Sequence, residues 1–313
     1  MKTAPMLVML LLSTVFVVQP QNVSESNRSA GNAEDRNVKV EMRNVVYHFA
    51  DNIAVHIRSM RGELAPADGH DLPIFDDRNS FTLQLASAEM AISTSSLANV
   101  LNSHVLTAHD APLKDIEITT EQDRIKVKGK LHNKGDISFE AQGTLSVTPD
   151  GQIRVHADKV KALHLPVKGL MDLFGVEIAD LIKTNKVKGI RAEKDELLLD
   201  PAQILPPPHI EGKLTAVRIQ GNNIVEVFGE KATAQAAYHG NYMAYKGNRL
   251  RFGKLTMDHT DMILIDMDER DPFDFYLDHY GDQLSAGYTK ITEAFGLWVF
   301  MRDYDKLKRG KSK

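Results

Sequence analysis

Four successive segments of alternating hydrophobicity, between residues 116 and 157, constrain the fold of this chain more than any other feature. Apolar side chains take every second position there, and charged or hydroxyl side chains stand between them. The apolar set is Ile116, Ile118, Ile125, Val127, Leu131, Ile137, Phe139, Ala141, Leu145, Val147, Ile153, Val155 and Ala157. A period of two predicts strands with one buried and one solvated face. The connections at 133–135 and 149–151 are short and carry turn residues, so we predict an antiparallel meander whose apolar face needs a cover.

The segment after the meander offers that cover. Its apolar residues fall at i, i+3, i+4, i+8, i+11 and i+12, which is the spacing of an amphipathic helix. They are Leu170, Leu173, Phe174, Ile178, Leu181 and Ile182. Pro166 suits the first turn of such a helix. A shorter helix is predicted before the meander, where Ser93, Thr94, Ser95 and Ser96 offer good N-caps ahead of an apolar stretch. We expect a sheet that curls around a helix on its apolar face.

Further strands are predicted on both sides of this region. They are 38–60 as a strand pair, 81–86, 197–199, 214–228 as a hairpin that turns at 221–223, 250–257 and 262–267. A helical stripe predicts a last helix, and its members are Leu284, Tyr288, Ile291, Phe295 and Trp298. The fold class is therefore α+β, a long, curled antiparallel sheet wrapped around amphipathic helices, with a C-terminal β-rich extension that ends in a helix.

The N-terminus has the pattern of an export signal. Lys2 precedes an apolar run at 6–18, which is shorter than the roughly 20 residues that span a membrane. Residues 17–21 lack the small-residue pattern of a cleavage site, so an uncleaved anchor is the alternative. The predicted organisation is 1–21 signal peptide, 22–37 flexible polar leader, 38–208 sheet-wrapped-helix domain, 209–301 β-rich extension and 302–313 basic tail that frays. We expect a periplasmic or secreted protein.

Composition excludes several kinds of function. The 313 residues include no cysteine, which excludes disulfides, zinc–thiolate sites, iron–sulfur clusters and a lipid-modified N-terminal cysteine. The formal net charge of −4 argues against a dedicated nucleic-acid binder. The patterns G-x-S-x-G, H-E-x-x-H, G-x-G-x-x-G and the Walker loop are missing from the sequence. We therefore predict a protein that is not an enzyme and has no catalytic residue, no metal and no cofactor.

Two polar groups are weighed against this prediction. An acidic run could offer hard oxygen ligands to calcium, although it lacks the EF-hand glycine and glutamate and a solvated turn is favoured. The run is Asp266, Asp268, Glu269, Asp271 and Asp274. The adjacent pairs Asp258–His259 and Asp278–His279 suggest a hydrolase as a minor hypothesis. Adjacent side chains on a strand point to opposite faces, so we expect that neither histidine is oriented by its neighbour.

Basic residues form the third group. Lys126, Lys128 and Lys130 share one strand face. A second set follows the cover helix and comprises Lys183, Lys186, Lys188 and Arg191. Basic residues at the end of a helix complement its dipole, and this structural role is favoured over the attraction of anionic lipid headgroups.

The order of the predicted elements and the amino-acid sequence of three short stretches resemble those of a known family. Helix, meander, amphipathic helix and strand follow one another over 93–200, with Leu-Ala-Asn-Val-Leu-Asn at 97–102, Pro-Asp-Gly at 149–151 and Leu-Pro-Val-Lys-Gly-Leu at 165–170. In these features the chain resembles the secreted bacterial LmeA-like phospholipid-binding proteins and, more distantly, the tubular lipid-binding (TULIP) superfamily. The resemblance implies a sheet wrapped around a helix, with an apolar groove for acyl chains and no catalytic residues. The long extension beyond Pro208 departs from that pattern.

The residues and the resemblance together predict an exported binding protein that sequesters or carries a lipid or other amphiphile. The predicted groove is lined by Ile125, Val127, Phe139, Leu145, Val155, Leu170, Phe174, Ile178 and Leu181. The expected partners are the amphiphile itself and, peripherally, an anionic membrane surface; no nucleic acid is expected and a protein partner is left open. Apolar grooves and filled cores share one sequence signature. A cell-envelope structural or interaction protein with a filled core and no ligand is therefore the alternative.

Overall fold

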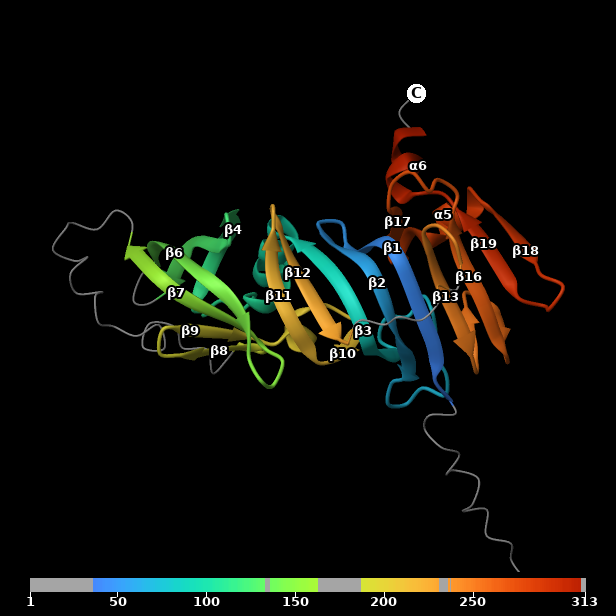
Figure 1. The fold of residues 1–313 in the computed structure, drawn as a ribbon, viewed down its shortest axis with the longest axis horizontal. Coiled ribbons are helices and arrows are strands. Elements are labelled where there is room, and N and C mark those ends of the chain that lie inside the picture. The colour runs from blue at the N-terminus through green and yellow to red at the C-terminus, as the bar shows by residue number, and fades with distance from the viewer. Residues whose placement is uncertain (1–35, 133–135, 163–186, 231–235, 237, 311–313) are drawn as a thin grey trace, which may run out of the picture. The chain divides into compact units, whose positions relative to one another are not determined.

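The computed structural model describes residues 36–132, 136–162, 187–230, 236 and 238–310 (Figure 1). Most of this part of the chain is strand, arranged in three sheets of eleven, six and two strands, and the helices are few and short. The sheets are large, mainly antiparallel and not closed. The predicted β-rich, antiparallel character is therefore confirmed, while the wrapping of a sheet around a helix stays a prediction.

The eleven-stranded sheet joins strands from both ends of the chain. Its order is β11-β12-β3-β2-β1-β13-β16-β19-β18, with β10 beside β3 and β17 beside β1. Its strands are β1 Val38–Ala50, β2 Ile53–Pro66, β3 Phe81–Ser93, β10 His209–Glu211, β11 Leu214–Gln220, β12 Asn223–Gly229, β13 Tyr242–Gly247, β16 Thr260–Asp266, β17 Phe273–Tyr276, β18 Tyr288–Ile291 and β19 Leu297–Met301. The blue strand β1 lies beside the orange strand β13 in Figure 1. Strands from the predicted extension thus flank β1, β2 and β3 on both sides.

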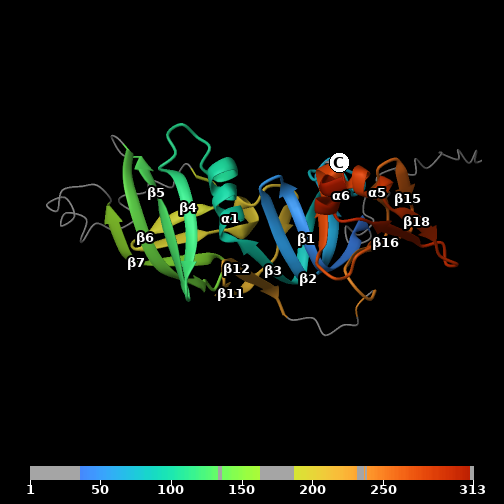
Figure 2. The same cartoon turned by 90° about the horizontal axis from the view of Figure 1, so that it is seen from above.

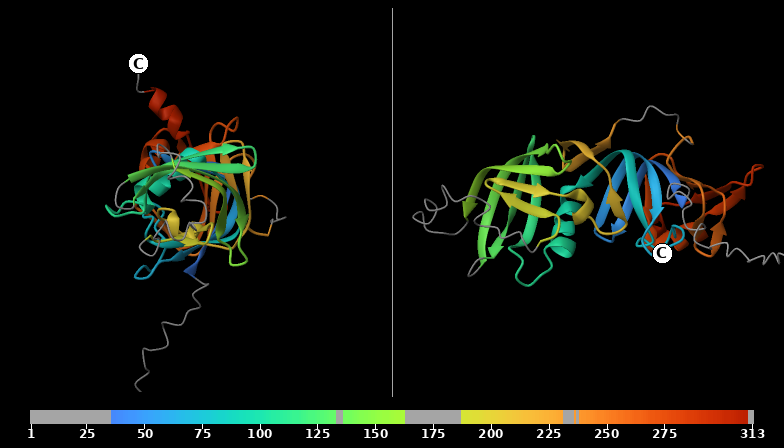
Figure 3. Two further views of the ribbon diagram at one scale, coloured as in Figure 1. Left: turned by 90° about the vertical axis from the view of Figure 1, so that its left-hand side faces the viewer. Right: turned by 90° about the horizontal axis from the view of Figure 1, so that it is seen from below.

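The six-stranded sheet contains the predicted meander. Its order is β4-β5-β6-β7-β9-β8, and every neighbouring pair is antiparallel. Its strands are β4 Leu113–Glu121, β5 Arg124–His132, β6 Asp136–Val147, β7 Ile153–Ala162, β8 Ile190–Glu193 and β9 Glu196–Leu199. Figure 3 shows the yellow strands β8 and β9 beside the green strands of the meander. The alternation of residues 116–157 therefore predicted both the strands and their pairing.

The first helix begins where the sequence offers its caps. Helix α1 spans Thr94–Val100 and continues as a π-helical turn, Leu101–Val105. The Ser93 side-chain oxygen accepts a hydrogen bond from the Ser96 backbone nitrogen at 3.0 Å, which caps the helix as predicted. Helix α1 contacts both β3 and β4 and so lies where the two larger sheets meet (Figure 2). The Asn102 side chain ties it to β4, because its amide donates to the Ile116 carbonyl and its oxygen accepts from the Ile116 nitrogen.

The remaining elements are short. They are α4 Pro201–Ile204, β14 Leu250–Phe252, β15 Leu255–Met257, a 3-10 turn Leu277–His279, α5 Tyr280–Ser285 and α6 Tyr304–Gly310. The hairpin predicted at 214–228 is confirmed as β11 and β12, and the strand predicted at 250–257 is a small hairpin of β14 and β15. One hydrophobic cluster collects buried residues from the two larger sheets, α1 and α4.

Two predictions near the C-terminus are wrong. The helical stripe at 284–298 is not one helix, since α5 ends at Ser285 and β18 and β19 follow. Val299 and Met301, which the stripe omits, are fully buried at a period of two, and β19 gains a parallel ladder with β16. The tail does not fray at its start, because Asp303 and Tyr304 are buried and α6 begins there.

Some predictions fall outside the described residues. These are the signal peptide, nearly all of the polar leader, the cover helix after Pro166 and the groove residues Leu170, Phe174, Ile178 and Leu181. The predicted domain boundaries stay predictions. Within the part of the chain that the structure describes, no helix combines the length and apolarity needed to cross a membrane.

Candidate ligand-binding site

The central strands of the eleven-stranded sheet present an apolar row to the core. Val45, Ile57 and Met90 stand opposite one another on β1, β2 and β3, and Glu226 on β12 continues the row. The first three side chains are at most 6% exposed. The row therefore places a single carboxyl at the end of an apolar surface.

A cavity of about 30 Å³ lies against this row. Its walls are Phe49, Val55, Ile57, Met60, Leu83, Met90, Ile92, Leu97, Pro201, Ile204, Leu205, Ile210 and Glu226. These residues come from the sheet, from α1, from α4 and its C-terminal flank, and from β10. All of them except Glu226 are apolar. A volume of this size holds about one or two water-sized groups.

Strand alternation explains why a glutamate enters this cavity. Ile224 and Phe228 on β12 belong to the hydrophobic cluster, and Glu226 stands between them on the same face. The nearby arginines cannot reach it, because Arg58 and Arg218 both pair with Glu89 on the opposite face, at 2.8 and 2.7 Å. No residue in the described part of the chain donates a hydrogen bond to the Glu226 carboxyl or forms an ion pair with it. Burial therefore raises the pKa of Glu226 from 4.5 to about 7.

This pKa shift has a consequence for stability. The folded state binds the proton of Glu226 more tightly than the unfolded chain does. The contribution of this proton to the free energy of unfolding is therefore fully present below the unfolded pKa and is lost as pH rises through 7. Replacing Glu226 by glutamine should remove this loss. We expect the variant's gain in free energy of unfolding over the wild type to be about 2 kcal/mol larger near pH 8 than near pH 5. Urea unfolding of both proteins at the two pH values measures it, and a gain that does not change with pH would contradict the assignment.

The structure describes five of the nine predicted groove residues and brings them to one face of the six-stranded sheet. Ile125 is buried, whereas Val127, Phe139, Leu145 and Val155 are half-buried and pack against the hydrophobic cluster. None of the five lines the cavity beside Glu226. A groove through these five residues stays a prediction. Sequence reasoning missed Glu226, although a lone glutamate within the otherwise apolar stretch 224–228 was the available signal.

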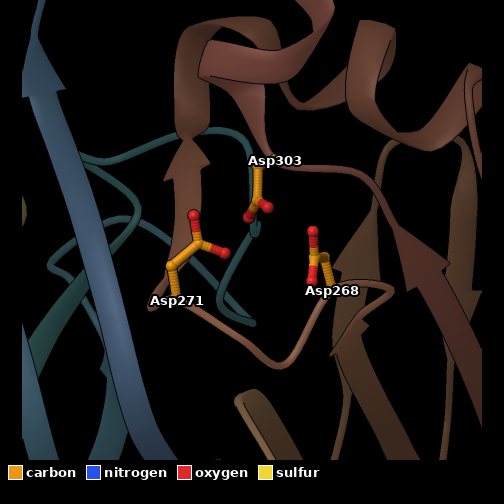
Figure 4. A group of neighbouring side chains, drawn as sticks. All are labelled: Asp268, Asp271 and Asp303. Carbon is orange, nitrogen blue, oxygen red and sulfur yellow. The ribbon is translucent and has the colours of Figure 1, made fainter.

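Two members of the acidic run, Asp268 and Asp271, form an ion-pair cluster with Asp303 around a lysine. Carboxylate oxygens of Asp268, Asp271 and Asp303 lie within 4.8 Å of one another and face a common centre (Figure 4). The Lys306 ammonium lies 2.9, 2.9 and 2.5 Å from them. Burial is the first influence on the pKa of Asp303 and raises it. The lysine already occupies the position that a cation would take, so this geometry does not support the calcium hypothesis.

The other members of the run have separate partners. Asp266 is 3% exposed and accepts a hydrogen bond from the Asn241 amide at 2.9 Å, and its burial raises its pKa to about 6. Asp274 accepts from the backbone nitrogen of Asp305 at 3.1 Å and pairs with His48. Two members of the run thus hold backbone and side chains together, which a purely solvated turn would not do.

The remaining candidates are engaged in ion pairs. Neither Asp–His pair lies on a strand, because 258–259 join β15 to β16 and 278–279 belong to the 3-10 turn. Asp258 pairs with Arg249 at 3.1 Å and Asp278 pairs with Arg78, so each aspartate has another partner than the adjacent histidine. The lysines of β5 pair with neighbouring strands, Lys126 with Glu140 at 3.1 Å and Lys130 with Asp115 at 2.7 Å. Such exposed pairs contribute less than about 1 kcal/mol each.

The second basic set is described only in part. Lys183 and Lys186 lie outside the described residues, and Arg191 pairs with Glu193 at 2.7 Å.

Comparison with known proteins identifies no family for this chain. No protein-family model, no curated protein and no solved structure matches the chain. The resemblance to the LmeA-like proteins rests on the residues quoted above and stays a prediction.

Proposed function

We propose that this protein is a non-enzymatic binding protein that sequesters or carries a lipid or other amphiphile against its apolar inner surfaces. The observation that carries the proposal is the set of half-buried apolar side chains on the meander, Val127, Phe139, Leu145 and Val155, beside a hydrophobic cluster that spans both larger sheets. A half-buried apolar face is a surface on which an acyl chain can lie. The proposal includes export and a relationship to the LmeA-like proteins.

The energetics of such a site need no catalytic group and no strong headgroup contact. Each methylene moved from water onto an apolar surface contributes about 0.8 kcal/mol, so a sixteen-carbon chain contributes up to about 12 kcal/mol before ordering costs. Micromolar affinity requires about 8 kcal/mol. Peripheral contact with an anionic membrane would then be weak and sensitive to salt.

The first experiment asks whether the protein carries a ligand when it is isolated. The full chain is purified without detergent, its mass is measured by native mass spectrometry, and its organic extract is analysed. We expect phospholipid or another amphiphile in stoichiometric amount. An apo mass without extractable amphiphile would contradict the proposal and favour the filled-core envelope protein, whose partner would then be sought by pull-down.

A matched pair of variants locates the binding surface. Leu145→Asn keeps the side-chain size but puts an amide on the apolar face of β6, and an unpartnered amide there weakens chain binding by about 1–3 kcal/mol. We expect at least about a tenfold loss of affinity for a single-chain amphiphile. Ser146→Asn introduces the same residue on the exposed face one position along and should change nothing. Equal affinity in both variants would place binding elsewhere.

A further inference from the structure

The hairpin of β18 and β19 carries the two most exposed large apolar side chains in the described part of the chain. Ile291, the last residue of β18, is 75% exposed, and Phe295, in the turn that follows, is 90% exposed. The other large apolar side chains are at most 48% exposed. This hairpin is the outermost edge of the eleven-stranded sheet and is drawn in red in Figure 1. Neighbouring apolar side chains in water indicate a contact surface.

Hydrogen bonds order the turn that carries Phe295. The Thr292 nitrogen donates to the Gly296 carbonyl at 2.8 Å, and the Gly296 nitrogen donates to the Thr292 hydroxyl oxygen at 2.8 Å. Phe295 has φ +63°, a left-handed conformation that disfavours large side chains. The other described non-glycine residues with positive φ are all polar: Asn44, Asp115, Gln122 and Lys194. The turn by itself favours glycine or asparagine at this position, so the phenylalanine calls for another reason.

Behind the turn lies a layer of amphipathic side chains. The Tyr288 ring stacks on the Phe300 ring with 4.5 Å between their centroids, and Trp298 lies 6.3 Å from Phe300. The Lys290 ammonium lies 5.5 Å from the Tyr288 ring and 5.4 Å from the Phe300 ring. Tryptophan, tyrosine and lysine are the residues that suit a membrane–water interface, because each joins an apolar body to a polar end. The hairpin thus presents an apolar tip in front of an interfacial layer.

The charges around the turn balance one another. Lys290 precedes the turn and Glu293 lies within it. The Asp261 carboxylate lies beside Gly296, and Asp261 stands opposite Lys246 in the ladder of β13 and β16. The turn region therefore has no net charge that would attract a strongly acidic or strongly basic partner.

The size of the apolar tip distinguishes a bilayer from a protein partner. A stable protein interface buries about 800 Å² on each side. Two large side chains on a turn provide at most about half of that area. Strand addition to β18 is opposed as well, because the strand has four residues and carries Lys290 on the free edge. A lipid bilayer, in contrast, surrounds a protruding side chain from all sides.

We propose that the turn of the β18–β19 hairpin docks this protein on a lipid bilayer. Ile291 and Phe295 enter the boundary between headgroups and acyl chains, and the layer that contains Lys290 and Trp298 lies at the level of the headgroups. The affinity comes from apolar burial and depends little on lipid charge or on salt. This inference does not rest on the proposed function, because docking requires no carried ligand.

The experiment uses Trp298 as a local reporter, because it is the only tryptophan in the sequence. The full-length protein is titrated with vesicles of phosphatidylcholine that is brominated on its acyl chains, which quenches the fluorescence of a nearby tryptophan. A second set of vesicles also contains phosphatidylglycerol, and both sets are measured at low and at high salt. The signal reports the hairpin itself, so vesicle binding through the apolar run at 6–18 does not mimic it.

A double variant and a control isolate the two apolar side chains. Ile291→Thr combined with Phe295→Asn removes both of them and spares the backbone, because threonine suits a strand and asparagine tolerates positive φ. The control Met267→Asn replaces an apolar side chain that is 43% exposed at the opposite end of the β16–β19 ladder. Thermal unfolding verifies that each variant is folded.

We expect vesicles to quench Trp298 in the wild type and in Met267→Asn, with little dependence on phosphatidylglycerol or salt. The double variant should need at least about ten times more lipid for the same quenching, because it buries less apolar surface. Absence of quenching in the wild type, equal quenching in the double variant, or quenching that disappears at high salt would overturn the proposal. Without quenching, a wild-type dimer that the double variant loses in sedimentation would assign the turn to a second copy instead.

Discussion

Replacing Gly229 by alanine is expected to lower the free energy of unfolding by about 3 kcal/mol or more. Gly229 has φ +61°, and a Cβ atom there would lie 1.9 Å from the Ala86 carbonyl oxygen on β3. Left-handed backbone disfavours a side chain by about 1–2 kcal/mol, and the overlap would push β12 away from β3. Urea unfolding at constant pH measures the loss.

Gly221 provides the matched control. It has nearly the same backbone conformation, φ +58°, but nothing lies within 4 Å of the added Cβ atom. Gly221→Ala should therefore lose only the conformational part, about 1 kcal/mol. Equal losses in the two variants would mean that the close approach of β12 to β3 at Gly229 does not contribute to stability. That result would contradict the placement of β12 beside β3 at this point.

Replacing Lys306 by methionine is the second large change. We expect a loss of about 3 kcal/mol at neutral pH, because three carboxylates would face one another without their cation and one of them, Asp303, is 1% exposed. The loss should be smaller at acidic pH, since burial raises the pKa of Asp303 and a protonated carboxyl needs no counterion. Urea unfolding at the two pH values measures both effects.

Calcium distinguishes the lysine's role as an internal cation from a simple packing role. In Lys306→Met the three carboxylates, within 4.8 Å of one another, become free to hold a divalent ion, which binds only the folded state and stabilises it. Calcium chloride should therefore raise the stability of the variant and leave the wild type unchanged. Lys254→Met removes an exposed lysine of the β14–β15 turn and should show neither effect. If calcium stabilised the wild type as much as the variant, Lys306 would not be the occupant of this cluster.

Local patterns predicted local structure well. The meander, the capped first helix and the hairpin of β11 and β12 each depend on residues a few positions apart, whose alternation, caps and turns act before any tertiary contact forms. The same method failed at 284–298, where apolar spacing fits a helix. There, pairing of β19 with β16 and burial of Val299 and Met301 outweighed the local signal.

Of the candidate site, only the apolar character could be predicted from the sequence. The sequence indicated an apolar surface without catalytic groups, and five of its predicted residues do share one face of the meander. Glu226 was overlooked because a single charged residue in a strand is usually an exposed one. The apolar cavity that it lines is completed by α1, α4 and β10, which come from distant parts of the chain.

By itself, the sequence of this protein determined which residues form strands and which way their side chains face, because alternation acts between neighbours. Only the tertiary structure decided the neighbours of each strand. Glu41 on β1 and Tyr242 beside it on β13 are 201 positions apart, and Lys306 reaches Asp268 across 38 positions. No local pattern encodes such pairs. They form because whole apolar faces must be buried together.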